Sequence, residues 1–276
     1  MTAPPRLFTR WRPAESERAA ALVIHGYGEH SGRYEHVFAA LTDIGCSCLG
    51  LDYRGFGRAE GRRAFIRSFA DYLDDVAWGL AAMREHTEEL PILLGHSQGG
   101  LIAALYAIEG RSPLRGLVLS SPALRFAVSV PRWKHALAHA LSSVWPTFTL
   151  PTELNARDLS HDENKLRQLR EDQLAVRVGT ARWYTENLRA QERALAGAGA
   201  LRTPTLLQVA GDDRVVDAAV TRAFYERVSA DDKTWIDYPG AYHEVYQETR
   251  EARAEALKDL CRWIRGLAAT NAVTRG

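Results

Sequence analysis

Residues 91–105 read PILLGHSQGGLIAAL, and this stretch decides the fold. Its centre, Gly95 to Gly99, fits G-x-S-x-G, the nucleophile elbow in which a sharp strand-to-helix turn lifts a serine hydroxyl above a sheet. Glycines flank such a turn because a larger side chain would collide with neighbouring backbone. The pentapeptide alone is a weak signal, but an apolar run precedes it and a helical pattern with small residues follows it. This context is the one that the motif requires, so we predict that Ser97 is a nucleophile.

Strand-like and helix-like segments alternate on both sides of the elbow. Short apolar runs bounded by turn residues are typical of buried parallel strands, and they occur at residues 19–24, 46–51, 91–94, 115–119, 204–210 and 234–238. Apolar residues at a spacing of three to four, from Phe65 to Met83 and from Leu257 to Leu267, indicate helices between and after them. We therefore expect an α/β-hydrolase fold, a mostly parallel doubly wound sheet with its active-site loops at the carboxyl ends of the strands.

The alternation stops between about residues 123 and 200, and we interpret this stretch as an inserted helical cap. Pro131 suits the first turn of a helix. The apolar residues that follow share one helix face and continue beyond it, which suggests a tunnel for substrate lined by Trp133, Leu137, Leu141 and Trp145. The expected organisation is a first part of the core at residues 1–122, a cap at 123–200 and a second part of the core at 201–276.

A serine hydroxyl needs a histidine to accept its proton and a carboxylate to orient that histidine. In α/β hydrolases the acid and then the histidine follow the serine along the chain. Of the nine histidines, His243 alone has this order and lies on a loop after an expected strand. Asp212 and Asp213 both follow the penultimate strand, and spacing does not separate them. The other aspartate is expected to cap that turn or the helix that begins near Ala218.

Two backbone amides are expected to form an oxyanion hole. The conventional donors are the N–H after the nucleophile, here Gln98, and one from the loop after an earlier strand, here Tyr27. The glycine-rich loop at residues 25–28 has neither G-x-G-x-x-G nor a following Gly-Lys-Ser/Thr, so nucleotide binding is not expected.

Composition narrows the class of protein further. The 276 residues are 46% hydrophobic and 25% charged, as in a globular protein with a sizeable core. A formal net charge of +1 gives no global field toward nucleic acid. No apolar run forms a signal-peptide core or a membrane span, and three cysteines do not suggest a disulfide framework, so the expected location is cytoplasmic. Cys46 and Cys48 lack partners at zinc-site spacing, so no metal site is expected.

Four motifs together resemble the monoglyceride lipase and lysophospholipase group of α/β hydrolases. They are HGYGEHSGRY at residues 25–34, DYRGFG at 52–57, GHSQGG at 95–100 and YPGAYHE at 238–244. The resemblance extends from about Leu22 to Leu267. It implies cleavage of monoacylglycerols or related single-chain esters beneath a mobile apolar cap, without a metal or organic cofactor. The acid of that family precedes a basic residue and an apolar pair, which by similarity favours Asp213.

The chain departs from the family pattern at two places near the site. The family usually has Met where this chain has Gln98, and commonly His-x-Gly-His where this chain has residues 53–56, Tyr-Arg-Gly-Phe. A backbone donor is indifferent to its own side chain, so the oxyanion hole should survive the first change. We expect this chain to differ from the family in its selectivity for substrate groups close to the acyl carbon.

The leading hypothesis is a monoacylglycerol lipase that acts on a small-molecule ester with an apolar acyl chain. The alternatives are a lysophospholipase, a short- or medium-chain carboxylesterase, a peptidase, or a non-catalytic ligand receptor on the same scaffold. We also expect transient contact of the cap with a membrane or micelle, and no nucleic-acid partner.

Overall fold

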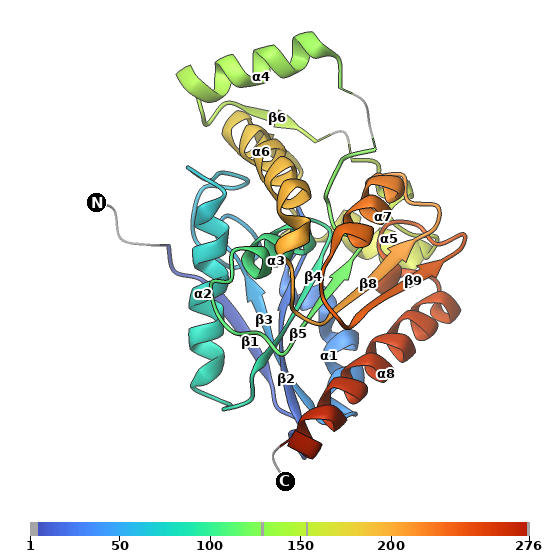
Figure 1. The fold of residues 1–276 in the computed structure, drawn as a ribbon. Helices are drawn as coiled ribbons and strands as arrows, with labels where there is room; N and C mark the ends of the chain where they lie inside the picture. Colours follow the sequence, from blue (N-terminus) through green and yellow to red (C-terminus); the bar gives the residue numbers. More distant parts are fainter. Residues whose placement is uncertain (1–4, 128–129, 153, 275–276) are drawn as a thin grey trace.

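A seven-stranded sheet forms the centre of the computed structural model, which describes residues 5–127, 130–152 and 154–274 (Figure 1). The strand order is β1-β3-β2-β4-β5-β8-β9, and every pairing is parallel except that of β1 with β3. The strands are β1 Phe8–Arg12, β2 Ala19–Ile24, β3 Cys46–Asp52, β4 Pro91–His96, β5 Gly116–Ser120, β8 Thr205–Ala210 and β9 Lys233–Tyr238. The expected mostly parallel, doubly wound α/β-hydrolase fold is confirmed.

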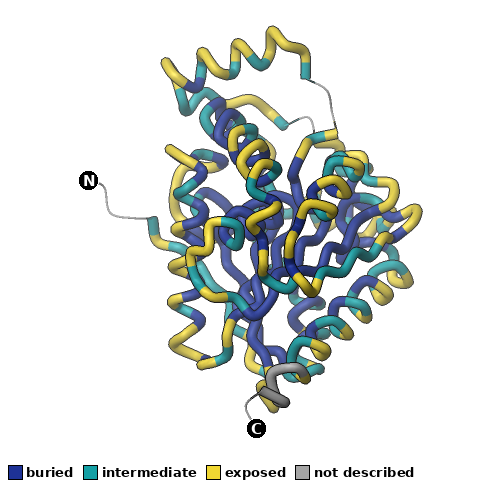
Figure 2. The backbone as a smooth tube through the Cα atoms, in the orientation of Figure 1, coloured by how far each residue is buried: buried dark blue, intermediate teal, exposed yellow. Residues whose placement is uncertain are grey.

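Helices cover both faces of this sheet. One face carries α1 (Glu35–Thr42) and α8 (Arg250–Thr274), and the other carries α2 (Ala70–Arg84), α3 (Gln98–Ile108) and α7 (Ala218–Arg227). Because helices cover both faces of the sheet, a central strand such as β2 is apolar on both of its faces. Its alternate residues enter two different hydrophobic clusters, so all six are buried and no polar residue interrupts the run. Figure 2 shows the same burial along the central strands.

Residues 123–200 contain more than helices. They hold α4 (Arg132–Val144), α5 (Glu163–Glu171), α6 (Ala181–Gly197) and two 3-10 turns, and also two short strands, β6 (Thr149–Pro151) and β7 (Val178–Thr180). The stretch that the sequence analysis interpreted as helical therefore also contains β structure. Strands of three residues are too short to show a period of two, and β6 and β7 are recognisable only by their antiparallel pairing. The division of the chain into core and cap stays a prediction.

Two other differences from the sequence analysis lie near the chain start. Strand β1 was not expected, because its side chains are partly exposed and it pairs only with β3 at the edge of the sheet. The helical pattern that begins at Phe65 belongs to α2 only from Ala70 onward. Phe65 and Phe69 precede the helix, and Phe69 is buried by tertiary contacts rather than by a helix face.

At the sharp turn between β4 and α3 the sheet and a helix approach closely. Ser97 has φ 51° and ψ −115°, a backbone conformation that non-glycine residues rarely adopt. Its N–H donates to the carbonyl of Ser120 on β5 over 2.9 Å. A Cβ on Gly99 would lie 2.3 Å from the carbonyl oxygen of Ile24 on β2, so α3 can begin here only without a side chain.

We expect Gly99→Ala to destabilise the fold, because the added methyl meets backbone that cannot rotate away. The loss in unfolding free energy should reach about 1–3 kcal/mol or more, measured by urea denaturation. Gly266→Ala in α8 is the control, since a Cβ there meets nothing within 4 Å. It should be neutral or should stabilise by up to about 1 kcal/mol. Equal stability of Gly99→Ala and wild type would contradict this account of the turn.

Candidate active site

Three side chains from three loops meet at the carboxyl edge of the sheet. Ser97 lies after β4, Asp213 after β8 and His243 after β9. The Ser97 Oγ is 2.8 Å from Nε2 of His243, and Nδ1 of His243 is 2.8 Å from Oδ2 of Asp213. With the imidazole proton assigned to Nδ1, which faces the carboxylate, Nε2 is free to accept the serine proton. This arrangement can activate a hydroxyl as a nucleophile.

The structure separates the two aspartates that spacing left open. The side chain of Asp213 is buried, and its Oδ1 accepts N–H groups from Val215 at 2.8 Å and Val216 at 3.0 Å. Asp212 is exposed, and its backbone N–H donates to Ala241. The N-terminus of α7 is capped by Asp217, so the suggestion that Asp212 caps this helix is wrong. The turn after β8 is capped by the side chain of Asp213, through its hydrogen bonds with the N–H groups of Val215 and Val216.

Charge around His243 adjusts its proton affinity. Burial lowers the pKa of the imidazole, but the charge and hydrogen bond of Asp213, helped by Glu244 and Glu29, outweigh burial and raise the pKa above its ordinary value. Burial raises the pKa of Asp213, yet His243 and the two backbone N–H groups bring it below its usual range. The carboxylate therefore stays ionised and stabilises a positively charged imidazole.

The residues expected to form the oxyanion hole lie on both sides of this group. Gln98 is the first residue of α3, and the amides of a first helical turn have no acceptor inside the helix. Tyr27 lies in the loop after β2, where its ring packs against Phe56 and Trp183 and its hydroxyl donates to the carbonyl of Val178. A Cβ on Gly26 would lie 3.2 Å from the Cβ of Ser97, so the loop that carries Tyr27 lies beside the elbow. The role of the two residues as donors stays a prediction.

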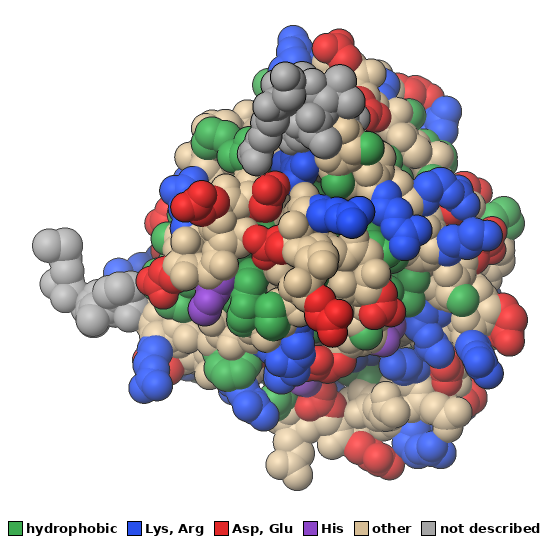
Figure 3. Space-filling view, turned by 90° about the horizontal axis from the view of Figure 1, so that it is seen from below, with side chains coloured by type: hydrophobic (Ala, Val, Ile, Leu, Met, Phe, Trp, Pro, Cys, Tyr) green, Lys and Arg blue, Asp and Glu red, His purple; other side chains and the backbone are tan. Residues whose placement is uncertain are grey.

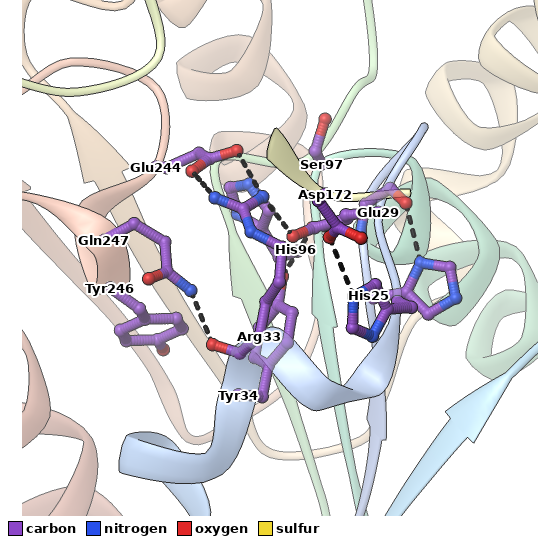
Figure 4. Close-up of polar contacts among 12 residues, drawn as sticks. His25, Glu29, Arg33, Tyr34, His96, Ser97, Asp172, Glu244, Tyr246 and Gln247 are labelled. Carbon is purple, nitrogen blue, oxygen red and sulfur yellow. Dashed lines mark hydrogen bonds and ion pairs between the residues drawn. The ribbon is translucent and has the colours of Figure 1, made fainter. Parts of the chain in front are cut away.

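A buried ionic network joins two of the site loops, and the sequence analysis missed it (Figure 4). The Glu29 carboxylate accepts the N–H of Gly26 at 2.6 Å, the hydroxyl of Tyr34 at 2.7 Å and Nη1 of Arg33 at 2.6 Å. Arg33 also donates to both oxygens of Glu244, at 3.0 and 2.7 Å. Glu244 follows His243 directly, so Arg33 connects the loop after β2 with the loop of the histidine.

The signal for this network was present in the motifs. Glu29 and Arg33 are four residues apart in GEHSGR, and Glu244 follows the histidine, but nothing in the sequence shows that these loops meet. Burial raises the pKa of Glu29, whereas Arg33 and the neighbouring histidines lower it, with a net result of about 2. Glu29 therefore remains an anion inside the protein, and its pairing with Arg33 makes that burial tolerable.

Part of the region expected to be a cap lies against the loop after β2. Nε2 of His30 is 2.9 Å from Oδ2 of Asp172, and the N–H of Val176 donates to the carbonyl of Gly28 at 2.9 Å. Figure 4 places Asp172 next to Glu29, beside the network. These contacts connect residues 172–178 with the loop that carries Tyr27.

The four side chains expected to bind substrate are not gathered around Ser97. Trp133, Leu137 and Trp145 are 64%, 50% and 58% exposed, and Leu141 is half-buried. Two polar side chains of α4 face the protein instead: Ser142 contacts Thr185 and Arg182 on α6, and His135 contacts Tyr184. Binding of substrate by these residues stays a prediction.

Neither a metal cluster nor a membrane span is found among the described residues. No group of three or more His, Cys, Asp or Glu side chains within residues 5–127, 130–152 and 154–274 could hold a metal ion. In the same part of the chain, no helix combines the length with the apolar character needed to cross a bilayer. The three cysteines, Cys46, Cys48 and Cys261, are free thiols.

Known proteins resemble this chain over most of its length. The family described as "Serine aminopeptidase, S33" matches residues 15–250. A phospholipase, YtpA, of Bacillus subtilis is 32% identical over 86% of this chain and 92% of its own length. The human monoglyceride lipase is 32% identical over 96% of this chain and 88% of its own. The crystal structure of a monoacylglycerol lipase from Paleococcus ferrophilus is 28% identical and superposes with a TM-score of 0.87, covering 96% and 99% of the two chains.

We expect the imidazole of His243 to titrate above its ordinary pKa, because Asp213 favours the charged form. Asp213→Asn should lower that pKa, since the amide keeps a hydrogen-bonding group but loses the charge. NMR titration of the imidazole resonances measures both values. Asp212→Asn is the matched control and should leave the titration unchanged, because Asp212 is exposed and water screens its charge. Equal shifts in the two variants would contradict the assignment of Asp213 as the partner.

Proposed function

This chain belongs to the α/β-hydrolase family described as serine aminopeptidase, S33, and to its monoglyceride lipase-like group, and we propose that it hydrolyses monoacylglycerols through an acyl-enzyme on Ser97. At the coarser level it is a serine hydrolase of carboxylic esters. The observation that carries the proposal is the continuous contact from Ser97 through His243 to Asp213, with 2.8 Å at each step.

The proposed reaction uses this contact in two half-reactions. His243 takes the proton of Ser97 as Oγ attacks the ester carbonyl, and Asp213 stabilises the imidazolium that forms. The N–H groups of Tyr27 and Gln98 hold the oxyanion of the tetrahedral intermediate. Its collapse releases the alcohol, which receives the proton from His243. Water, activated by the same imidazole, then attacks the acyl-enzyme and releases the fatty acid.

The family description names a peptidase, and the charges near the site favour an ester instead. An aminopeptidase must bind a cationic amino terminus, which requires an available carboxylate. Besides Asp213, the carboxylates whose charge reaches His243 are Glu29 and Glu244, and Arg33 pairs with both of them. The relatives of this chain include monoacylglycerol lipases and a phospholipase, which favours a single-chain lipid ester as substrate.

Ser97→Ala should abolish hydrolysis of 2-monoacylglycerol, with kcat falling by at least about 10³-fold, because nucleophile and base act as a unit. A fluorophosphonate probe should label wild type at Ser97 and leave the variant unlabelled. Release of fatty acid from monoacylglycerol, lysophosphatidylcholine and p-nitrophenyl acetate, and of amine from an aminoacyl-p-nitroanilide, measures the preference. Failure of folded wild type to react with the probe would favour a receptor. A preference for another substrate would assign the chain to the corresponding alternative.

We also propose that this chain makes transient contact with a membrane or micelle, through the apolar side chains Trp133, Leu137 and Val144 of α4 and Trp145 directly after it. These side chains are between 50% and 81% exposed, while Ser142 and His135 on the same helix contact α6. A surface helix of a globular protein normally has the opposite orientation. Seen from below, the face away from α4 shows a mixture of acidic and basic side chains with small apolar areas between them (Figure 3).

We expect the double substitution Trp133→Ser and Leu137→Ser to lower hydrolysis of monoacylglycerol in vesicles by about tenfold, because less apolar area enters the lipid surface. Hydrolysis of dissolved p-nitrophenyl butyrate should stay within about twofold, since the triad is untouched. Trp78→Ser, which removes a 46% exposed tryptophan from α2, is the control and should alter neither rate. Equal losses on both substrates would mean that the two side chains stabilise the fold rather than contact lipid.

A further inference from the structure

The carbonyl of Gly26 is held by two buried side chains. The hydroxyl of Tyr53 is 3.0 Å from this oxygen, and Nδ1 of His25 is 2.7 Å from it. Gly26 directly precedes Tyr27, the proposed oxyanion donor, so this carbonyl belongs to the same peptide unit as the Tyr27 N–H. A trans peptide is planar, with its carbonyl and its N–H pointing in opposite directions. Fixing the Gly26 carbonyl therefore also fixes the direction of the Tyr27 N–H.

Both side chains remain hydrogen-bond donors at neutral pH. Burial raises the pKa of the Tyr53 phenol well above its usual value, so the hydroxyl keeps its proton. Burial lowers the pKa of His25, so its ring is neutral and has one N–H. We assign that proton to Nδ1, which faces the carbonyl, because Nε2 is buried without a hydrogen-bond partner in the described part of the chain.

Tyr53 is in turn fixed by the rings around it. Its side chain is fully buried, stacks on His25 at 4.3 Å between ring centroids, and contacts Phe56 and Tyr72 at 4.9 and 5.0 Å. The other side of the Gly26 residue is held as well, because its N–H donates to Glu29. Hydrogen bonds therefore hold both the N–H and the carbonyl of Gly26, and this restrains the loop after β2.

We propose that Tyr53 is a positioning residue of the oxyanion hole, which aims the Tyr27 N–H at the site of the developing oxyanion by donating its phenol proton to the Gly26 carbonyl. The proposal rests on the proposed function, since it assumes that an oxyanion forms beside Ser97. Tyr53 stands where the resembling family commonly has His, at the start of the loop after β3. At this position the chain therefore differs from the residue that is common in the family.

Tyr53→Phe tests the proposal, because it removes one oxygen atom and keeps the ring that packs against His25 and Tyr72. Turnover of p-nitrophenyl butyrate should fall by about 10- to 100-fold. This fall is no larger than the one that follows removal of a direct oxyanion donor. KM should change by no more than about twofold. The inhibition constant of an alkylboronic acid, whose tetrahedral adduct places an oxygen in the hole, should rise by the same factor as kcat falls.

Tyr106→Phe is the matched control. Tyr106 is also a buried tyrosine, and the substitution also removes one hydrogen bond, the one to Ser112 at 3.0 Å. It should cost similar stability and leave kcat and the inhibition constant within about twofold. Rates are expressed per active site titrated with a fluorophosphonate, so partial unfolding of either variant does not enter kcat. Equal kcat in the two variants would overturn the proposal.

Replacing Tyr53 with 4-aminophenylalanine supplies a second test, since its amino group can donate from nearly the same place as the phenol. It should restore most of the turnover that Tyr53→Phe loses. Loss of turnover in Tyr53→Phe without recovery in this variant would also overturn the proposal. An inactive wild type would instead contradict the proposed function, so the two failures are distinguishable.

Discussion

The backbone turn at Ser97 is the constraint on which the rest of the site depends. A serine at φ 51° costs of the order of 1–3 kcal/mol, so the turn persists only where its surroundings enforce it. Two features enforce it here: the contact of Gly99 with the backbone of β2, and the hydrogen bond from the Ser97 N–H to β5. The turn places the Ser97 hydroxyl at the carboxyl edge of the sheet. The loops after the other parallel strands lie at the same edge.

Those loops are joined by polar contacts in addition to the ring packing of Tyr27, Tyr53 and Phe56. Arg33 connects Glu29 with Glu244, and the hydroxyl of Tyr53 connects the loop after β3 with Gly26. Buried ion pairs add little net stability, because desolvation offsets most of the attraction, but they require one geometry. The network is therefore better suited to holding His243 and the Tyr27 amide in fixed relative positions than to stabilising the protein.

Helix α4 exposes apolar side chains that a surface helix would normally bury. On α4, His135 and Ser142 contact α6 whereas Trp133, Leu137 and Val144 are exposed, so the helix loses apolar burial that folding would otherwise gain. This orientation is understandable if a lipid surface supplies the missing apolar contact, as we propose. The same helix shows that an apolar stripe in a sequence identifies a helix face without indicating what covers that face.

The sequence by itself determined the α/β fold, the positions of six strands along the chain and the candidates Ser97 and His243, because apolar runs and the elbow motif are local patterns. It left Asp212 and Asp213 equivalent from spacing, missed the edge strand β1 and the two short strands β6 and β7, and assigned Arg33 and Tyr53 no role. Only the tertiary structure decided these points. A carboxylate's partner, a strand's neighbour and the exposed side of α4 depend on which distant segments meet, and residue spacing along the chain does not contain that information.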